Sequence, residues 1–272
     1  MCCAAAAAQT WRESIPCRAR HNVGEVSLKM SQAYAVTSGK GGVGKSTVSV
    51  GLALAFLKLD KRVLLVDMDE GLRCLDIMLG ADESAVFDLS DVLSGREADD
   101  AVYSVPEHEG LYLIPAPSEI GRIDAFSFTG LAKQLCELYD IVIFDFPAGM
   151  DFTLYSCLPE NTLFLTVATP DPVSVRDAAA VSRKLGDAGR PSRLVINCFT
   201  YGLMRRRLQK NIDEVIDGAG LRLAGVIPKS DELAFLPFNH GIKSGGKAMA
   251  AFLRTAKRLG GEQILLPKLK KI

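Results

Sequence analysis

Short, continuous apolar runs alternate along the chain with longer segments whose apolar residues recur at helical spacing. The runs predict strands at Ala33–Thr37, Val63–Val66, Leu111–Ile114, Ile141–Phe144, Thr162–Ala168, Leu194–Ile196 and Leu223–Ile227. Continuous runs are typical of strands that are covered on both faces. The longer segments predict helices at Lys45–Leu59, Phe126–Leu138, Val173–Leu185, Leu203–Asp217 and Lys247–Leu259. This alternation predicts an α/β fold with a mostly parallel, doubly wound sheet.

The pattern covers residues 31–261 without an internal repeat or a linker, so we expect one domain there. Residues 1–30 differ, because they carry Cys2, Cys3, a run of alanines and Trp11 but no hydrophobic period. We expect this segment to be a disordered or non-native N-terminal extension. Met30 is our preferred start of translation, and Met1 is the alternative.

Composition is ordinary for a globular protein and excludes a disordered, collagen-like or disulfide-rich chain. The 272 residues include 48% hydrophobic residues, and 32 Lys and Arg balance 32 Asp and Glu. The charge is unevenly spread, with a net charge of −10 over residues 30–150 and +8 over residues 151–272. Such asymmetry either marks a surface for a charged partner or reflects solvated faces.

A glycine-rich segment joins the first predicted strand to the first predicted helix. It fits the pattern G-x-x-x-x-G-K-[ST], whose glycines let backbone N–H groups surround phosphate oxygens. Its residues are Gly39, Lys40, Gly41, Gly42, Val43, Gly44, Lys45, Ser46 and Thr47. We expect Lys45 to reach the β- and γ-phosphates and Ser46 to ligate Mg²⁺. We expect Thr47 near the α-phosphate.

Lys40 is unusual in such a loop, because a second lysine at this position cannot easily serve the phosphates of its own chain. The segment GKGGVGKST resembles the deviant Walker A motif of the MinD/ParA ATPases. The resemblance extends from about Ala33 to Leu259 and implies a P-loop NTPase of the SIMIBI type. It further implies an ATP-bound homodimer, in which Lys40 reaches the partner's phosphates and acts in catalysis with Lys45.

Two more predicted strands end in carboxylates. Asp67 and Asp69 follow the second strand and point to the same side of an extended chain. Their segment resembles the switch I region of the septum-site-determining MinD branch of the family. By this resemblance Asp69 positions the attacking water, and Asp67 has a supporting role near the nucleotide and Mg²⁺. Cys74 stands where that branch usually has Asn.

The strand Ile141–Phe144 ends in Asp145 and matches a Walker B pattern, whose carboxylate reaches Mg²⁺, usually through water. The segment that follows matches the family form D-x-P-A-G. Its Gly149 allows the backbone to turn beside the γ-phosphate, which makes it a candidate switch residue.

An amide and a proline are the candidates for contacts with the base. Asn197 follows a predicted strand, and its side chain can both donate to and accept from an adenine edge. By resemblance Asn197 and Pro228 lie beside the base. Cys198 departs from the family's usual Arg, and Lys229 and Ser230 depart from the usual acidic pair after Pro228.

The last residues, 262–272, form a candidate amphipathic membrane-targeting tail. At about 100° per residue, Leu265, Leu266, Leu269 and Ile272 share one arc of a helix. We expect this tail to bind anionic membrane, and a frayed terminus is the alternative. An ATP dimer would present two tails and so raise avidity without new contacts.

These features predict an ATPase switch that is cytoplasmic and peripheral on the inner face of the cell membrane. By resemblance it helps to place the cell-division septum, together with a division-inhibitor protein and an ATPase-activating protein. The basic run Arg205–Arg207 keeps DNA binding open, so the alternative is a ParA-type DNA-partition or flagellar-number ATPase. A small-molecule ligase or kinase would not need Lys40, and an iron–sulfur carrier would need paired cysteines.

Overall fold

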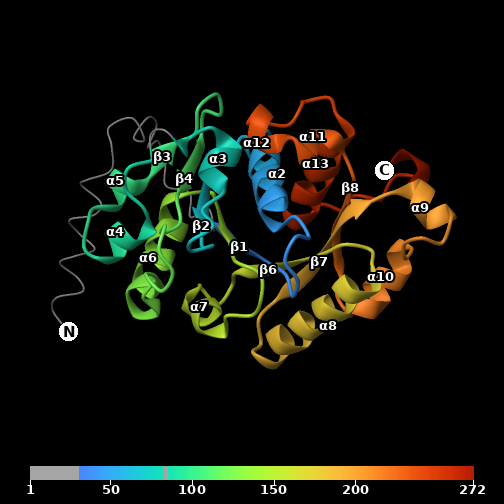
Figure 1. Ribbon diagram of the computed structural model, residues 1–272, viewed down its shortest axis with the longest axis horizontal. Helices are drawn as coiled ribbons and strands as arrows, with labels where there is room; N and C mark the ends of the chain where they lie inside the picture. The colour runs from blue at the N-terminus through green and yellow to red at the C-terminus, as the bar shows by residue number, and fades with distance from the viewer. Residues whose placement is uncertain (1–30, 83–84) are drawn as a thin grey trace.

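The computed structural model describes residues 31–82 and 85–272, which surround one eight-stranded sheet (Figure 1). The expectations for residues 1–30 and for a start at Met30 lie outside the described residues. The strands are β1 (Gln32–Thr37), β2 (Val63–Asp67), β3 (Tyr103–Ser104), β4 (Leu111–Ile114), β5 (Ile141–Asp145), β6 (Leu163–Ala168), β7 (Ser192–Phe199) and β8 (Leu223–Pro228). Their order is β3-β4-β2-β5-β1-β6-β7-β8, and only the β3–β4 pair is antiparallel among the described strands. All seven predicted strands are confirmed, and so is the α/β fold.

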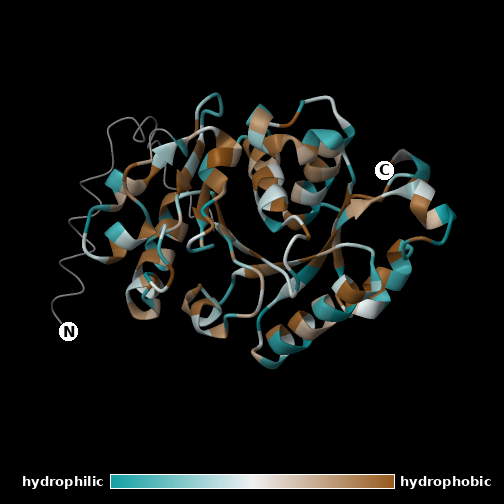
Figure 2. Cartoon of the chain, viewed as in Figure 1, coloured by the Kyte–Doolittle hydropathy of each residue, from teal (hydrophilic) through white to brown (hydrophobic). Residues whose placement is uncertain are grey.

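Helices cover both faces of the sheet. They are α2 (Lys45–Leu57), α3 (Leu75–Leu79), α4 (Leu89–Leu93), α5 (Ala98–Ala101), α6 (Ala125–Leu138), α7 (Phe152–Cys157), α8 (Pro172–Asp187), α9 (Tyr201–Arg205), α10 (Ile212–Ala219), α11 (Asp231–Ala234), α12 (Leu236–Asn239) and α13 (Lys247–Leu259). In Figure 1, α2, α3, α12 and α13 lie above the sheet, whereas α6, α7, α8 and α10 lie below it. In Figure 2 polar residues gather on the outer sides of helices such as α8 and α10, whereas α2 is almost entirely buried between the sheet and α13.

Alternate residues of β1 explain the two layers. Tyr34 and Val36 pack into the core beneath α2 and α13, whereas Ala33 and Ala35 pack on the opposite side with α6. Small residues on one face and larger ones on the other therefore build two separate cores around the central strand. The phosphate loop leaves β1 at the C-terminal edge between these cores.

One predicted helix is wrong. The segment Leu203–Asp217 contains two short helices, α9 and α10, in place of one continuous helix. Arg207 takes a left-handed backbone conformation with φ of 58°, which a helix cannot continue through. Asn211 then caps α10, because its side chain accepts from the Glu214 N–H while Glu214 accepts from the Asn211 N–H.

The tail also differs from the predicted helix. Residues 262–268 have no regular structure, and only Leu269–Lys271 form a short 3₁₀ turn. Pro267 lacks the N–H that a helix interior needs, and Leu266, Leu269 and Ile272 pack on the domain. Among residues 31–82 and 85–272, no helix combines the length and apolar character needed to span a bilayer.

Candidate nucleotide site

The phosphate loop lies between β1 and the N-terminus of α2. Gly42 and Gly44 adopt positive φ angles of 75° and 84°, a region in which other L-residues are strained. A Cβ atom at Gly39 would lie 2.7 Å from the backbone oxygen of Asp177 in α8. The glycines are thus required both by loop conformation and by close packing. Lys45 begins α2 and is only 8% exposed, so its charged group is held inside the loop.

The sheet order places three functional strand ends side by side. Strands β2, β5 and β1 are neighbours, and Asp67 pairs in register with Asp145. Ser49 of α2 donates a hydrogen bond of 2.7 Å to Asp145 Oδ1, whereas Asp145 Oδ2 is buried without a partner. Burial raises the pKa of Asp145 to about 6, although Ser46, Ser49 and Lys45 oppose this increase. The free oxygen beside Ser46 fits a divalent cation or a water bound to it.

The switch I segment is held by Asp67. Its carboxylate accepts from the backbone N–H groups of Asp69 at 3.0 Å, Cys74 at 3.2 Å and Leu75 at 3.2 Å. Burial and the nearby Asp145 carboxylate raise the pKa of Asp67 to about 7, against the effect of these hydrogen bonds. Asp67 therefore shapes the turn that presents Asp69.

Asp69 is only partly buried, and burial raises its pKa while Lys45 opposes the increase. Cys74 lies 3.5 Å from Ser46, measured from Sγ to Oγ, so the residue that replaces the usual Asn reaches a predicted metal ligand. The structure thus brings together Lys45, Ser46 and the switch I carboxylates, as the sequence predicted.

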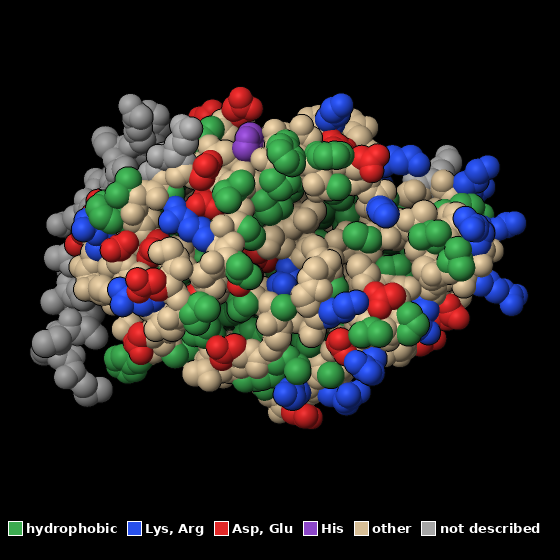
Figure 3. Space-filling model, viewed as in Figure 1, with side chains coloured by type: hydrophobic (Ala, Val, Ile, Leu, Met, Phe, Trp, Pro, Cys, Tyr) green, Lys and Arg blue, Asp and Glu red, His purple; other side chains and the backbone are tan. Residues whose placement is uncertain are grey.

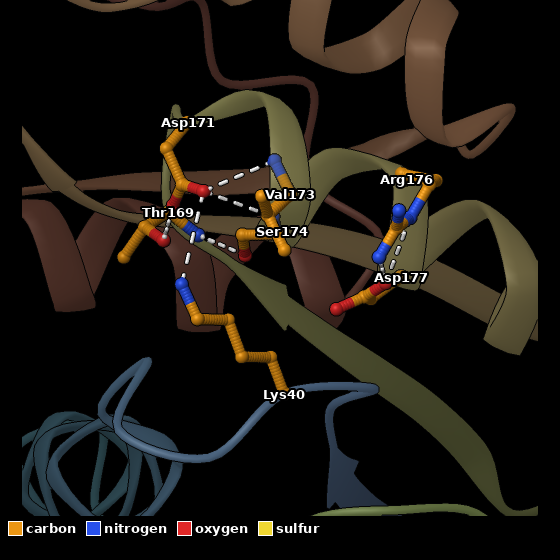
Figure 4. A network of polar contacts seen from close by, with 7 residues as sticks. All are labelled: Lys40, Thr169, Asp171, Val173, Ser174, Arg176 and Asp177. Atoms are coloured by element: carbon orange, nitrogen blue, oxygen red, sulfur yellow. Dashed lines mark hydrogen bonds and ion pairs between the residues drawn. The ribbon is translucent and has the colours of Figure 1, made fainter.

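The Lys40 side chain points toward Asp171 at the start of α8 (Figure 4). Its Nζ lies 3.8 Å from Asp171 Oδ1, and both side chains are partly exposed. Asp171 also accepts from the Thr169 hydroxyl and caps α8 through the N–H groups of Val173 and Ser174. Despite partial burial, these hydrogen bonds and Lys40 hold the pKa of Asp171 below its usual value. Within one chain, Lys40 therefore pairs with Asp171, the N-cap residue of α8.

The segment after β5 is tied to the start of the phosphate loop. Gly149 has φ of 116°, and its N–H donates to Ser38 O at 3.0 Å. Tyr155 of α7 donates to Gly149 O at 3.2 Å, and its hydroxyl is also hydrogen-bonded to the hydroxyl of Thr37. A cavity of about 520 Å³ is lined by residues 146–153 and Tyr155. The candidate switch at Gly149 thus contacts Ser38, the residue after β1, directly, and it is linked to Thr37 of β1 through Tyr155.

The two candidate base residues lie on neighbouring strands β7 and β8. Asn197 is 3% exposed, and its Nδ2 donates to Val43 O at 2.8 Å, so it also fixes the phosphate loop. Pro228 pairs with Phe199 and lines a cavity of about 330 Å³. Lys229 lines the same cavity, which places a basic group where the family usually has an acidic one.

Sequence reasoning missed several residues that hold the site together. Ser49 and Tyr155 make the contacts given above, and Asp171 pairs with Lys40. Glu70 accepts from three successive backbone N–H groups, those of Gly121 at 3.0 Å, Arg122 at 2.7 Å and Ile123 at 2.7 Å. Of these residues, Ser49 carried a signal in the sequence, since it lies three residues after Ser46 and four after Lys45 and so shares their face of the helix.

Comparisons with known proteins agree with this geometry. The model of the CobQ/CobB/MinD/ParA nucleotide binding domain matches residues 34–241. The septum site-determining protein MinD of Bacillus subtilis is 33% identical over 251 residues, which cover 89% of this chain and 93% of that protein. Two solved structures are also similar to this chain over most of its length.

The MinC:MinD cell division protein complex of Aquifex aeolicus contains a chain with a TM-score of 0.79 and 29% identity, covering 88% of this chain and 99% of that one. MinD of Pyrococcus horikoshii, solved with Mg-ADP, has a TM-score of 0.73 and 26% identity, covering 85% and 96%. Motif, fold and similarity agree over the same residues: this chain belongs to the MinD/ParA family of P-loop nucleotide-binding proteins.

Proposed function

We propose that the protein is an ATPase switch that dimerises with ATP, binds the cytoplasmic face of the membrane and helps to place the division septum. The observation that carries the proposal is the convergence of Lys45, Ser46, Asp69 and Asp145 at one edge of the sheet. Lys40 belongs to the same phosphate loop as Lys45 and Ser46 but faces Asp171. The similarity to septum site-determining MinD proteins supports the cellular role.

In the proposed hydrolysis, the backbone N–H groups of Gly39–Thr47 and the Lys45 ammonium hold the phosphates. Thr47 lies near the α-phosphate, and Asn197 and Pro228 flank the adenine. Mg²⁺, when bound, neutralises charge on the β- and γ-phosphates. Ser46 and Asp145 are its proposed ligands, Asp145 through water, which suits the unpartnered Asp145 Oδ2.

Asp69 orients the attacking water, and Asp67 supports it by fixing the switch I turn through three backbone hydrogen bonds. Gly149 senses the γ-phosphate end through its contacts with Ser38 and Tyr155. Water attacks the γ-phosphate in line, and ADP and phosphate leave. The residues supply position and charge, which is what phosphoryl transfer chiefly requires.

Lys40 completes the site in the proposed homodimer. Within one chain its ammonium faces Asp171, so it has to leave that partner before it can serve the phosphates of a second copy. Dimerisation would then couple ATP binding to the exposure of two C-terminal tails on one particle. Two weak anchors bind membrane far better than one.

The proposed partners are anionic membrane, a division-inhibitor protein and an ATPase-activating protein. The inhibitor is supported by the similarity to a MinD chain solved as a MinC:MinD cell division protein complex. The proposed location is the cytoplasm, with peripheral binding to the inner face of the cell membrane.

Liposome co-sedimentation in ATP or ADP tests the proposal. The wild type should pellet with anionic vesicles in ATP and stay in solution in ADP. Lys40→Ala and a truncation after Gly261 should stay in solution with either nucleotide, the first for lack of a dimer and the second for lack of a tail. Equal pelleting of the wild type in ATP and ADP would reject the membrane switch.

A DNA-partition function is the second candidate, because Arg205, Arg206 and Arg207 are all exposed at the end of α9. DNA binding through these residues would weaken steeply with salt. Salt-dependent retention on DNA in ATP, without vesicle binding, would favour this function.

A further inference from the structure

The C-terminal tail has a docking surface on its own domain. Ile272 is only 8% exposed and belongs to the apolar cluster that β7, β8, α8 and α10 build. Leu266 and Leu269 are partly buried against the same cluster. The three residues are among those that the sequence pattern assigned to the membrane-binding face.

Polar contacts hold the segment that leads into this dock. Arg258 of α13 donates from Nε to Ile264 O at 2.6 Å, and from Nη1 to Ala224 O at 3.4 Å. Leu265 is 89% exposed, so it takes no part in the docking. The tail therefore follows a defined path between α13 and β8 and ends beside α9 (Figure 1).

The end of the tail also forms a wall of the cavity beside Pro228. Lys270 and Ile272 line this cavity together with Tyr201 of α9 and Lys229. Tyr201 itself packs against the apolar cluster that receives the tail. The receiving surface is thus built by residues that are separate from the tail in sequence and can be changed without altering it.

Charge works against this docking. Lys268 and Lys270 of the tail are exposed, and the exposed residues Arg205–Arg207 extend from α9. Figure 3 shows Lys and Arg side chains gathered at the end of the molecule where α9 and the C-terminus lie. Like charges at one end oppose close approach, whereas an anionic surface would attract both groups. The apolar contacts and the Arg258 hydrogen bond to Ile264 therefore hold the tail against this repulsion.

We propose that the docked tail is a closed state, in which an internal surface competes with the membrane for the same apolar side chains. Ile272, Leu269 and Leu266 cannot be buried in the domain and in a bilayer at once. Membrane binding consequently requires undocking, and any change that weakens the dock favours the membrane. This inference rests on the proposed membrane function and adds an autoinhibitory surface to it.

Limited trypsin digestion followed by mass spectrometry tests the dock without membrane. Cleavage after Lys268 should be about fivefold faster in Tyr201→Ala than in the wild type, because the open population rises. Ile272→Ala should have the same effect, and a change at the last residue does not threaten the fold. Leu208→Ala is the matched control, since Leu208 is a nearby residue that is 62% exposed. Unchanged cleavage in both test variants would overturn the dock.

Co-sedimentation with vesicles of phosphatidylcholine and phosphatidylglycerol tests the competition. Tyr201→Ala, whose tail is intact, should pellet in ADP several-fold more than the wild type and Leu208→Ala. Faster cleavage without increased pelleting would overturn the closed state. Leu265→Ala distinguishes the membrane-anchor proposal from the closed-state proposal. Because Leu265 is exposed in the docked tail, the substitution should reduce pelleting in ATP and leave cleavage unchanged. Full pelleting of Leu265→Ala and of the truncation after Gly261 would instead reject the tail as a membrane anchor, whatever the digestion shows.

Discussion

At the scale of single residues, the buried carboxyls of Asp145 and Asp67 should make metal binding depend on pH. Burial raises their pKa values from 3.8 to about 6 and about 7, so both lose protons near neutrality. Because Mg²⁺ binds the ionised form, the stabilisation by Mg-ADP should be small at about pH 5 and rise through about pH 7. Thermal unfolding with and without Mg²⁺ across this range measures it. Asp145→Asn should abolish the dependence on Mg²⁺.

The same groups give the metal-free protein the opposite trend. A carboxyl whose pKa is raised by folding binds its proton more tightly in the folded state, so its ionisation costs stability. The free energy of unfolding should therefore fall as pH rises from about 4 to about 7. Chemical denaturation in a chelator tests this. A rise in stability over this window would show that the carboxyls are already ionised in the folded protein.

Substitutions of Lys45 and Lys40 should affect nucleotide binding and ATP hydrolysis differently. Lys45 lies inside the loop, so Lys45→Ala should lose nucleotide binding. Lys40 instead faces Asp171, so Lys40→Ala should keep it, while the phosphate release rate falls by about a hundredfold or more. Calorimetric titration with ADP and a phosphate-release assay measure the two effects. Loss of ADP binding in Lys40→Ala would place Lys40 at the phosphates of its own chain.

At the scale of elements, Tyr155 connects α7 to β1 and to the switch segment. Tyr155→Phe leaves the buried Thr37 hydroxyl and Gly149 O without this partner. We expect a loss of about 1–3 kcal/mol in the free energy of unfolding. Tyr139→Phe is a suitable control, because that ring packs against Tyr112 at the other end of β5. A similar loss in both variants, measured by urea denaturation, would mean that the hydroxyl contacts contribute nothing specific.

The elements also show how far the sequence could predict the structure. Each buried strand and the phosphate loop are formed by contiguous residues, so both could be predicted from local sequence patterns. Strand β3 has two residues and no buried face, so it left no pattern. Tyr155 reaches Thr37 across 118 positions, and Lys40 reaches Asp171 because the adjacent strands β1 and β6 end side by side; such contacts exist only after folding. The break between α9 and α10 depends on the conformation of Arg207, which a helical period does not reveal.

At the scale of the whole molecule, the charge separation in the sequence becomes a basic end around α9 and the C-terminus. Among residues 31–82 and 85–272, no ion pair involves Arg205, Arg206 or Arg207. Replacing all three with Ser should therefore leave the fold intact. A Lys or Arg near an anionic membrane contributes about 1 kcal/mol, so vesicle affinity in ATP should fall by tenfold to about a hundredfold.

Varying the vesicle composition and the salt concentration shows whether this basic end binds anionic membrane or DNA. The loss of affinity in the triple Ser variant should be large on vesicles with phosphatidylglycerol and absent on phosphatidylcholine alone, and it should shrink as salt screens the charges. Tail and arginines then act together, as a short anchor needs a second signal for stable binding. Unchanged vesicle binding with lost DNA retention would instead assign the arginines to nucleic acid and favour the partition function.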